Sequence, residues 1–118
     1  MTLLTSGNVL VVGGLGPGSI EPRSYLNNAL DSAELYDPAT ETWASAGSPA
    51  ITQTDNLSVL MPSGKVAVMA GSYLSSLSFM EMYDPESGTW SGMAPLAQFR
   101  RTTHTATLLL SGKILVVG

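Results

Sequence analysis

The sequence predicts an all-β fold made of repeated four-stranded antiparallel units, and two recurring elements support this prediction. The first is Tyr36-Asp37-Pro38 followed by Trp43, which returns 47 residues later as Tyr83-Asp84-Pro85 followed by Trp90. The second is an apolar run, a Ser-Gly turn and another apolar run, which occurs three times with turn glycines at Gly7, Gly64 and Gly112. Repeats of this length indicate stacked units that cannot bury their apolar faces alone.

Each Ser-Gly element is expected to form a hairpin from the first two strands of a unit. Glycine supplies the positive φ that a tight turn requires. The flanking runs are four to six residues long and rich in Val, Ile and Leu, as in Val9–Val12, which favours strands over helix. The first strands are expected within residues 2–4, 57–61 and 105–110.

The Tyr-Asp-Pro elements mark the third and fourth strands. Residues 32–36 and 79–83 read as third strands that stop at Asp-Pro, because proline donates no hydrogen bond to a ladder and presets φ for a turn. Trp43 and Trp90 then lie on short fourth strands, and a link rich in Gly and Pro follows each. Four short strands with a recurrent aromatic, in units of about 48 residues, predict the blades of a β-propeller.

The repeats divide the single domain, residues 1–118, into an incomplete ring. We expect a first blade at 1–47 that lacks most of its first strand, a second at 48–96, and the first two strands of a third at 97–118. Propellers close with about four to eight blades. The expected partners are therefore further copies of the chain, as a homo-oligomer, or the remainder of a longer propeller. Residues 1–13 correspond to 106–118, so in an assembly the two ends compete for one position, which strand exchange would resolve.

The apolar run, paired glycines, Tyr-Asp-Pro and tryptophan together resemble the kelch motif over essentially the whole chain. The amino-acid sequences of residues 32–38, 104–109 and 111–118 are similar to those of bacterial-type kelch repeats, including the repeats of the galactose oxidase central domain. The resemblance implies structural roles for the glycines, tyrosine and tryptophan of each blade, here Gly13, Gly14, Tyr36, Trp43, Gly71, Tyr83 and Trp90. Ala70 replaces the first glycine of the second blade, which implies slightly different packing there.

Composition narrows the function. The net charge of −4 gives no electrostatic footprint for nucleic acid, and no stretch approaches the ~20 apolar residues of a membrane helix. The absence of cysteine excludes disulfides and thiolate sites and leaves the compartment open. Galactose oxidase holds copper with histidines and tyrosines and crosslinks a cysteine to one tyrosine. With one histidine, His104, and no cysteine, this chain is expected to have no catalytic residue, metal or cofactor.

Three other features could be read as functional sites, but each has a simpler structural interpretation. Residues 9–19 resemble a strand that enters a glycine-rich nucleotide loop, but the third glycine position is Ser19, so an inserted loop is the better interpretation. His104 has no evident partner and is expected to be a structural polar residue near a strand start. The repeated aromatics could bind sugar, but their repetition favours packing between blades.

The candidate binding residues come from topology. In an up-and-down blade, the loops from strand two to three share one face with the links between blades. On this loop face lie Arg23, Tyr25, Asn27, Tyr73, Gln98, Arg100 and Arg101. Rigid scaffolds place binding residues on such loops, and arginines can hold a carboxylate or phosphate through paired hydrogen bonds. Arg101 also resembles the arginine that often begins a kelch strand.

These observations predict a non-catalytic module that binds a protein partner on its loop face. The alternative is the carbohydrate-binding portion of an extracellular galactose-oxidase-like protein. Truncation of Trp90 to alanine is expected to cost about 3–5 kcal/mol, as for a buried aromatic residue.

Overall fold

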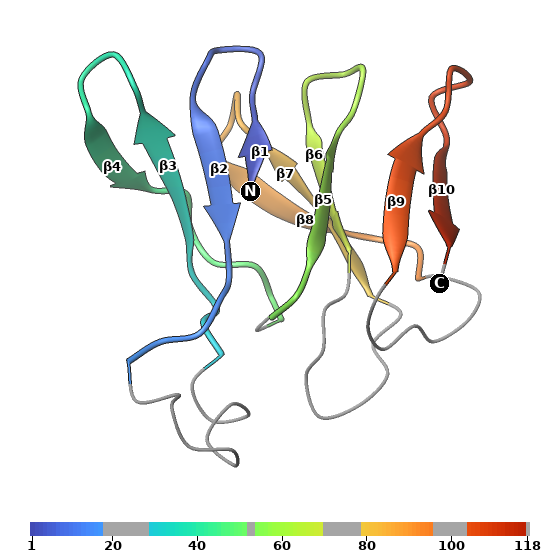
Figure 1. Cartoon of the computed structure of the whole chain (residues 1–118), viewed down its shortest axis with the longest axis horizontal. Coiled ribbons are helices and arrows are strands. Elements are labelled where there is room, and N and C mark those ends of the chain that lie inside the picture. Colours follow the sequence, from blue (N-terminus) through green and yellow to red (C-terminus); the bar gives the residue numbers. More distant parts are fainter. Residues whose placement is uncertain (18–28, 52–53, 70–78, 96–103, 118) are drawn as a thin grey trace.

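The structure, a computed structural model, describes residues 1–17, 29–51, 54–69, 79–95 and 104–117 (Figure 1). Two four-stranded antiparallel sheets and a two-stranded sheet follow one another along the chain, which confirms the predicted fold class. The first contains β1 (Thr2–Leu3), β2 (Val9–Val12), β3 (Ala33–Asp37) and β4 (Thr42–Ser45). The second contains β5 (Leu57–Leu60), β6 (Val66–Met69), β7 (Met80–Asp84) and β8 (Thr89–Met93). The third contains β9 (Thr105–Leu108) and β10 (Ile114–Val117).

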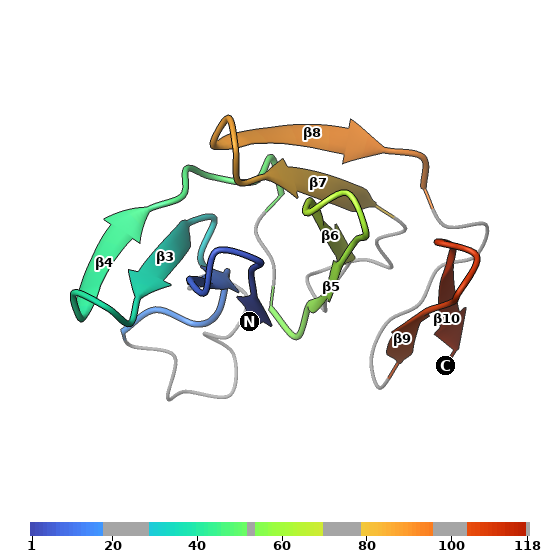
Figure 2. The ribbon, with the colours of Figure 1, turned by 90° about the horizontal axis from the view of Figure 1, so that it is seen from above.

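The sheets are arranged as blades of a fan (Figure 2). Their first strands lie side by side, with β1 beside β5 and β5 beside β9. Within each complete blade the strands then follow in sequence order, so β4 and β8 are outermost. The side chains of Thr2 and Ser58 share a 2.5 Å hydrogen bond between the two innermost strands. This arrangement brings the face of one blade against the opposite face of the next.

The hairpin turns repeat with nearly the same geometry in all three sheets. Gly7, Gly64 and Gly112 have φ values of 92°, 85° and 79°, which L side chains rarely adopt. Their amides donate to Leu4, Met61 and Leu109, with N···O distances of 3.0, 2.9 and 2.9 Å. The predicted Ser-Gly turns are therefore present in every copy.

The third strands run one residue further than the sequence suggested. Asp37 and Asp84 still pair with Thr42 and Thr89, because the proline that ends the ladder follows the aspartate. Each aspartate then stabilises its own turn, since Asp37 Oδ1 accepts the Ala39 amide at 2.9 Å. Asp84 Oδ1 accepts the Glu86 amide at 3.0 Å in the same way.

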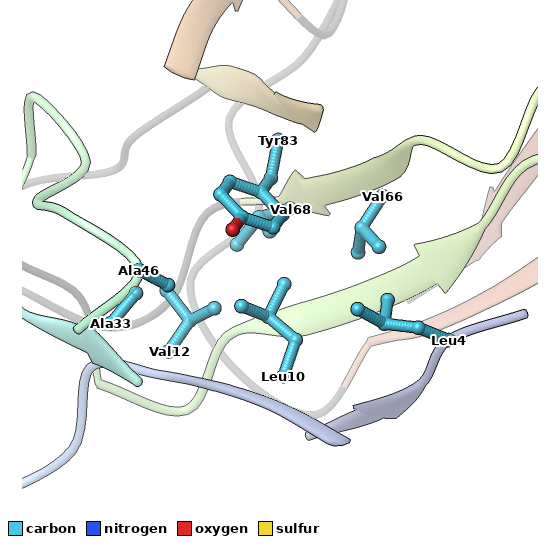
Figure 3. Packing of buried hydrophobic residues seen from close by; sticks show 8 residues of the cluster. All are labelled: Leu4, Leu10, Val12, Ala33, Ala46, Val66, Val68 and Tyr83. Carbon is cyan, nitrogen blue, oxygen red and sulfur yellow. The ribbon is translucent and has the colours of Figure 1, made fainter. Parts of the chain in front are cut away.

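The hydrophobic core lies between the two complete blades (Figure 3). One face of the first blade supplies Leu4, Leu10, Val12, Ala33 and Ala46. The facing side of the second blade supplies Val66, Val68 and Tyr83, with Leu60 and Trp90 packed at the margin. The core is therefore an interface between repeats, as expected for units that cannot bury their faces alone.

Candidate interblade docking surface

Each complete blade carries one row of large side chains across its four strands. In the second blade the row is Leu60, Val66, Tyr83 and Trp90, each directly opposite the next in the ladder. In the first blade it is Leu3, Val9, Tyr36 and Trp43. Directly opposed residues lie on the same face of a sheet. Both rows end in the same aromatic pair, because the rings of Tyr36–Trp43 and Tyr83–Trp90 lie 5.0 Å apart at 43° and 42°.

In the second blade this row is covered by the first blade. Tyr83 is only 1% exposed, and Trp90 is half-buried with its indole nitrogen donating to the Ala46 carbonyl at 2.8 Å. The chain passes beneath the indole at Gly47, whose φ of 76° favours glycine. A Cβ added there would lie 3.6 Å from the indole Cδ1 and Nε1 atoms. Trp90 therefore closes the junction between the blades.

A buried carboxylate makes a second contact across the same junction. Glu81 lies on the covered face of β7, and its Oε1 accepts the Ala50 amide at 2.7 Å. Ala50 belongs to the link that leaves the first blade. The side chain of Asn56 makes a third contact, because its Nδ2 donates to the Val12 carbonyl at 2.9 Å. Hydrogen bonds to buried polar groups are costly to remove, so these contacts fix how one blade sits on the next.

The corresponding face of the first blade is open. Trp43 is 57% exposed although its stacking with Tyr36 matches that of Trp90 with Tyr83. Glu34, at the position of Glu81, is also exposed. No neighbouring blade lies on this side in the described part of the chain (Figure 2). We call Leu3, Val9, Glu34, Tyr36 and Trp43 the open face.

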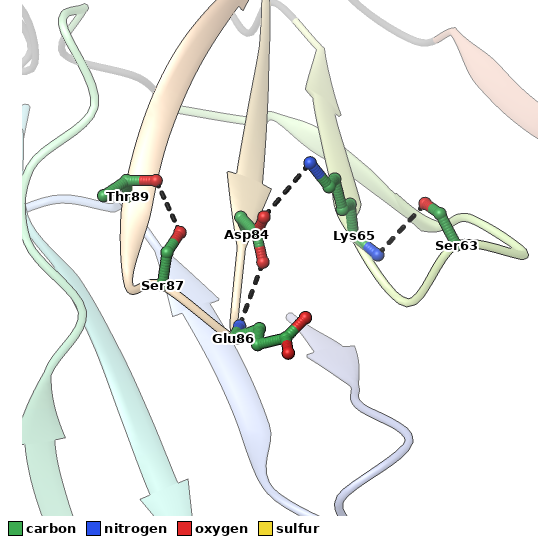
Figure 4. A network of polar contacts seen from close by, with 6 residues as sticks. All are labelled: Ser63, Lys65, Asp84, Glu86, Ser87 and Thr89. Carbon is green, nitrogen blue, oxygen red and sulfur yellow. Dashed lines mark hydrogen bonds and ion pairs between the residues drawn. The ribbon is translucent and has the colours of Figure 1, made fainter.

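At the turn end of the second blade lies an ion pair that has no counterpart among the described residues of the first blade (Figure 4). Lys65 Nζ lies 3.0 Å from Asp84 Oδ2, and this bond, together with the Glu86 amide, lowers the pKa of the Asp84 carboxyl. Burial, with a contribution from the Asp84 charge, raises the pKa of the neighbouring Tyr83 hydroxyl. In the first blade Asn8 stands at the Lys65 position, so Asp37 has no equivalent cation in its own hairpin.

The predicted structural glycines follow β2. Gly13 and Gly14 have φ values of 62° and 123°, and their backbones bond to Ser32 and Leu30 at 2.9 Å. Leu15 then forms a β-bridge with Ala29, so residues 15–17, the described part of the chain after Gly14, begin no helix of the kind that a nucleotide loop requires. Gly71 lies outside the described residues.

The loop-face residues also lie outside the described part of the chain. These are Arg23, Tyr25, Asn27, Tyr73, Gln98, Arg100 and Arg101. The strand ends that flank them are described, and they lie at the end of the molecule opposite the tight turns (Figure 1). The structure therefore shows the platform from which these segments leave.

His104 is buried immediately before β9, near a strand start as the sequence suggested. It occupies the position of Asn56, 48 residues earlier, but neither ring nitrogen has a hydrogen-bond partner among the described residues. The described residues contain no group of three or more His, Asp or Glu side chains that could hold a metal ion. Among them there is also no helix long and apolar enough to cross a membrane.

Comparison with known proteins agrees with this geometry. Residues 5–50 match the kelch motif. The match covers β2, β3 and β4 of the first blade. The fold is similar to a solved structure described as a novel fungal alcohol oxidase with catalytic diversity among the AA5 family, in complex with copper. The TM-score is 0.75 at 20% sequence identity, over 92% of this chain and 24% of the oxidase chain. The chain thus spans about a quarter of the oxidase's length, and the likeness concerns the fold.

Sequence reasoning missed the difference between the two aromatic pairs. Their spacing and local sequence are the same, so both were expected to pack between blades. Whether a tryptophan is covered depends on which side of its blade it faces, and the hydrogen bond from Trp90 back to Ala46 and the burial of Tyr83 show that direction.

Proposed function

We propose that the chain is a non-catalytic binding and scaffold module whose kelch propeller is completed by further blades. The observation that carries this proposal is the exposed Trp43 beside the covered Trp90. The two tryptophans share one stacking geometry and one place in the blade. The second blade uses that place to join its neighbour, so the first blade presents a surface suited to the same use.

The aromatic side chains on the open face support the same proposal. A tyrosine and a tryptophan each bury about 150–250 Å2 when they are covered. Contiguous exposed apolar surface of this kind marks interaction sites in soluble proteins. The repeated residues of the kelch blades serve packing in the covered junction, through Trp90, Glu81 and Tyr83. Because the repeated residues pack between blades, we assign the blades a structural role and assign recognition of a partner to the loop face.

Recognition on the loop face would rely on Arg23, Arg100 and Arg101. Arginine is a favoured anchor at protein interfaces, and its planar group holds carboxylates through two parallel hydrogen bonds. The proposal is supported by the described strand ends on either side of these segments, which lie at the end of the β-scaffold opposite the tight turns. The proposed partner is therefore a protein that presents an acidic segment.

An array of acidic twelve-residue peptides tests this proposal on the full chain. Peptides that bind should lose affinity about tenfold or more when Arg23, Arg100 and Arg101 are all changed to alanine, because each supplies a charge-assisted contact. The matched control is Lys65→Ala, which removes a cation at the tight-turn end. Equal affinity for the triple variant and the wild-type chain, with unchanged circular dichroism, would contradict the proposed loop-face site.

The likeness to a copper-containing alcohol oxidase favours a second candidate, the carbohydrate-binding portion of an extracellular galactose-oxidase-like protein. Calorimetric titration with galactose and galactose-containing oligosaccharides distinguishes the two. Saturable sugar binding without peptide binding would favour this candidate. Production of hydrogen peroxide from a primary alcohol by the copper-loaded chain would contradict the non-catalytic assignment.

A further inference from the structure

We infer that the chain assembles by exchanging hairpins, with β9–β10 of one copy taking the place of β1–β2 in the first blade of a second copy. The composite blade would contain β9 and β10 from one copy and β3 and β4 from the other. This inference rests on the proposed completion of the propeller by further blades and names a second copy of this chain as the source.

The two hairpins are nearly interchangeable in sequence. Residues 2–13 and 107–118 are identical at nine of twelve aligned positions. The three differences are Thr5 against Leu110, Asn8 against Lys113, and Val9 against Ile114. The turn glycines Gly7 and Gly112 are equivalent. A hairpin this similar can adopt the backbone and the face pattern of the one it replaces.

The residues that β1–β2 buries in the core are present and exposed in β9–β10. Leu4, Leu10 and Val12 are 4%, 1% and 8% exposed between the two complete blades. Their equivalents Leu109, Leu115 and Val117 have identical side chains and are 40%, 49% and 56% exposed. The second copy's Val66, Val68 and Tyr83 would cover the exposed set just as they cover the native one.

The outer edge of β10 is free to accept a strand. β2 and β6 each pair with a third strand, whereas the third sheet ends at β10 in the described part of the chain. Unpaired edges are templates for pairing with another chain. Transferring the β2–β3 register places Val116 opposite Glu34 of the second copy and Leu115 opposite Leu35.

The incoming hairpin is also the more extensive of the two. β1 pairs with β2 at two residues, Thr2 and Leu3. β9 pairs with β10 at four residues, Thr105 to Leu108. Replacement therefore exchanges a short first strand for a full one, with more ladder hydrogen bonds in the composite blade.

Charge complementarity points to the same partner. Lys65 pairs with Asp84 in the second blade, but in the first blade Asn8 faces the position of Asp37. The third hairpin has Lys113 at this position and contains no equivalent aspartate. Hairpin exchange would bring Lys113 of one copy to Asp37 of the other and recreate the ion pair of the second blade.

Exchange also covers the open face. Once β3 and β4 of the second copy join β10, Trp43 faces the outer part of the first copy's second blade, on the side away from the first blade. On that side Met69 and Met80 are already buried, whereas Met93 is only half-buried. Met93 stands at the position of Ala46, whose carbonyl accepts the Trp90 bond. Methionine adapts to irregular partners and contacts aromatic rings favourably. Each copy would then contribute two blades, so a closed trimer would have six and a tetramer eight.

Two single-cysteine variants of the full chain, which has no native cysteine, test the exchange. Copies carrying Glu34→Cys are mixed with copies carrying Val116→Cys, incubated to equilibrium and oxidised mildly. Directly opposed residues of an antiparallel ladder have Cα atoms about 4.5–5.5 Å apart, which suits a disulfide. The mixed 34–116 dimer should be the main product. The matched control mixes Leu115→Cys copies with the same Glu34→Cys copies. The side chain at 115 lies on the opposite face of the ladder, so this mixture should form about tenfold less crosslinked dimer.

Molar mass of the same samples separates the possible failures. Stable association without the 34–116 crosslink would overturn hairpin exchange and leave the proposed completion of the propeller standing. Monomers at every concentration would overturn both. A second measurement needs no cysteine: Lys113→Asp should weaken association about two- to fivefold, and adding Asp37→Lys to the same chain should restore it. Failure of the second change to restore association would also contradict the exchange.

Discussion

Changing Trp90 to alanine is expected to destabilise the folded chain by about 3–5 kcal/mol, toward the lower end because the indole is half-buried. The substitution leaves a cavity beside Tyr83 and removes the donor to the Ala46 carbonyl. Small domains have only about 5–15 kcal/mol of stability in total, so the loss would be severe. Urea denaturation followed by far-ultraviolet circular dichroism measures it.

The matched control for this prediction is Trp43→Ala. Trp43 stacks on its tyrosine in the same way but lies exposed on the open face, so its truncation should cost less than about 1 kcal/mol in the monomer. Comparable losses for the two variants would show that Trp43 is covered in solution even at low concentration. A neutral Trp90→Ala substitution would contradict the packing of the second blade on the first.

Leu10→Ala should cost about 2–5 kcal/mol, whereas Leu115→Ala should cost less than about 1 kcal/mol in the monomer. The two leucines have equivalent places in nearly identical hairpins. Leu10 is buried against the second blade, and Leu115 lies on the exposed side of β10. Thermal unfolding at micromolar concentration measures both, and equal effects would contradict the burial difference between the hairpins.

Leu10→Ala and Leu115→Ala should also differ in their effect on association between copies. When the hairpins exchange, Leu115 takes the buried place of Leu10, so Leu115→Ala should weaken association at high concentration while it leaves the monomer nearly unaffected. Leu10→Ala acts mainly on the monomer, because the hairpin that carries it is displaced. The two substitutions thus separate monomer stability from association, and an association constant unchanged by Leu115→Ala would count against exchange.

Local sequence was sufficient to predict the strands and turns of the blades. The Ser-Gly turns require positive φ, which Gly7, Gly64 and Gly112 supply, and the aspartate-proline pairs stop the ladder. These are short-range steric constraints, so they can be read from a few neighbouring residues. Each third strand runs one residue beyond its predicted end because Asp37 and Asp84 still pair before their prolines.

The covered and open faces could not be predicted in the same way. Burial of Trp43 or Trp90 depends on a blade some 45 residues away, and both tryptophans have the same local sequence pattern. The candidate binding residues Arg23, Arg100 and Arg101 were predicted from the connectivity expected of an up-and-down blade, and they lie outside the described residues. The repeat pattern does not predict which residues bind a partner, because the residues that recur in each blade are those that pack in the core.

Molar mass in solution, measured by light scattering coupled to gel filtration over a concentration series, tests the central claim most directly. The account predicts a discrete closed assembly of three or four copies that dissociates to monomer on dilution. In the assembly, Trp43 should become protected from iodide quenching. A well-folded monomer at every concentration, with Trp43 always accessible, would contradict the claim that this chain completes its kelch propeller with further copies of itself.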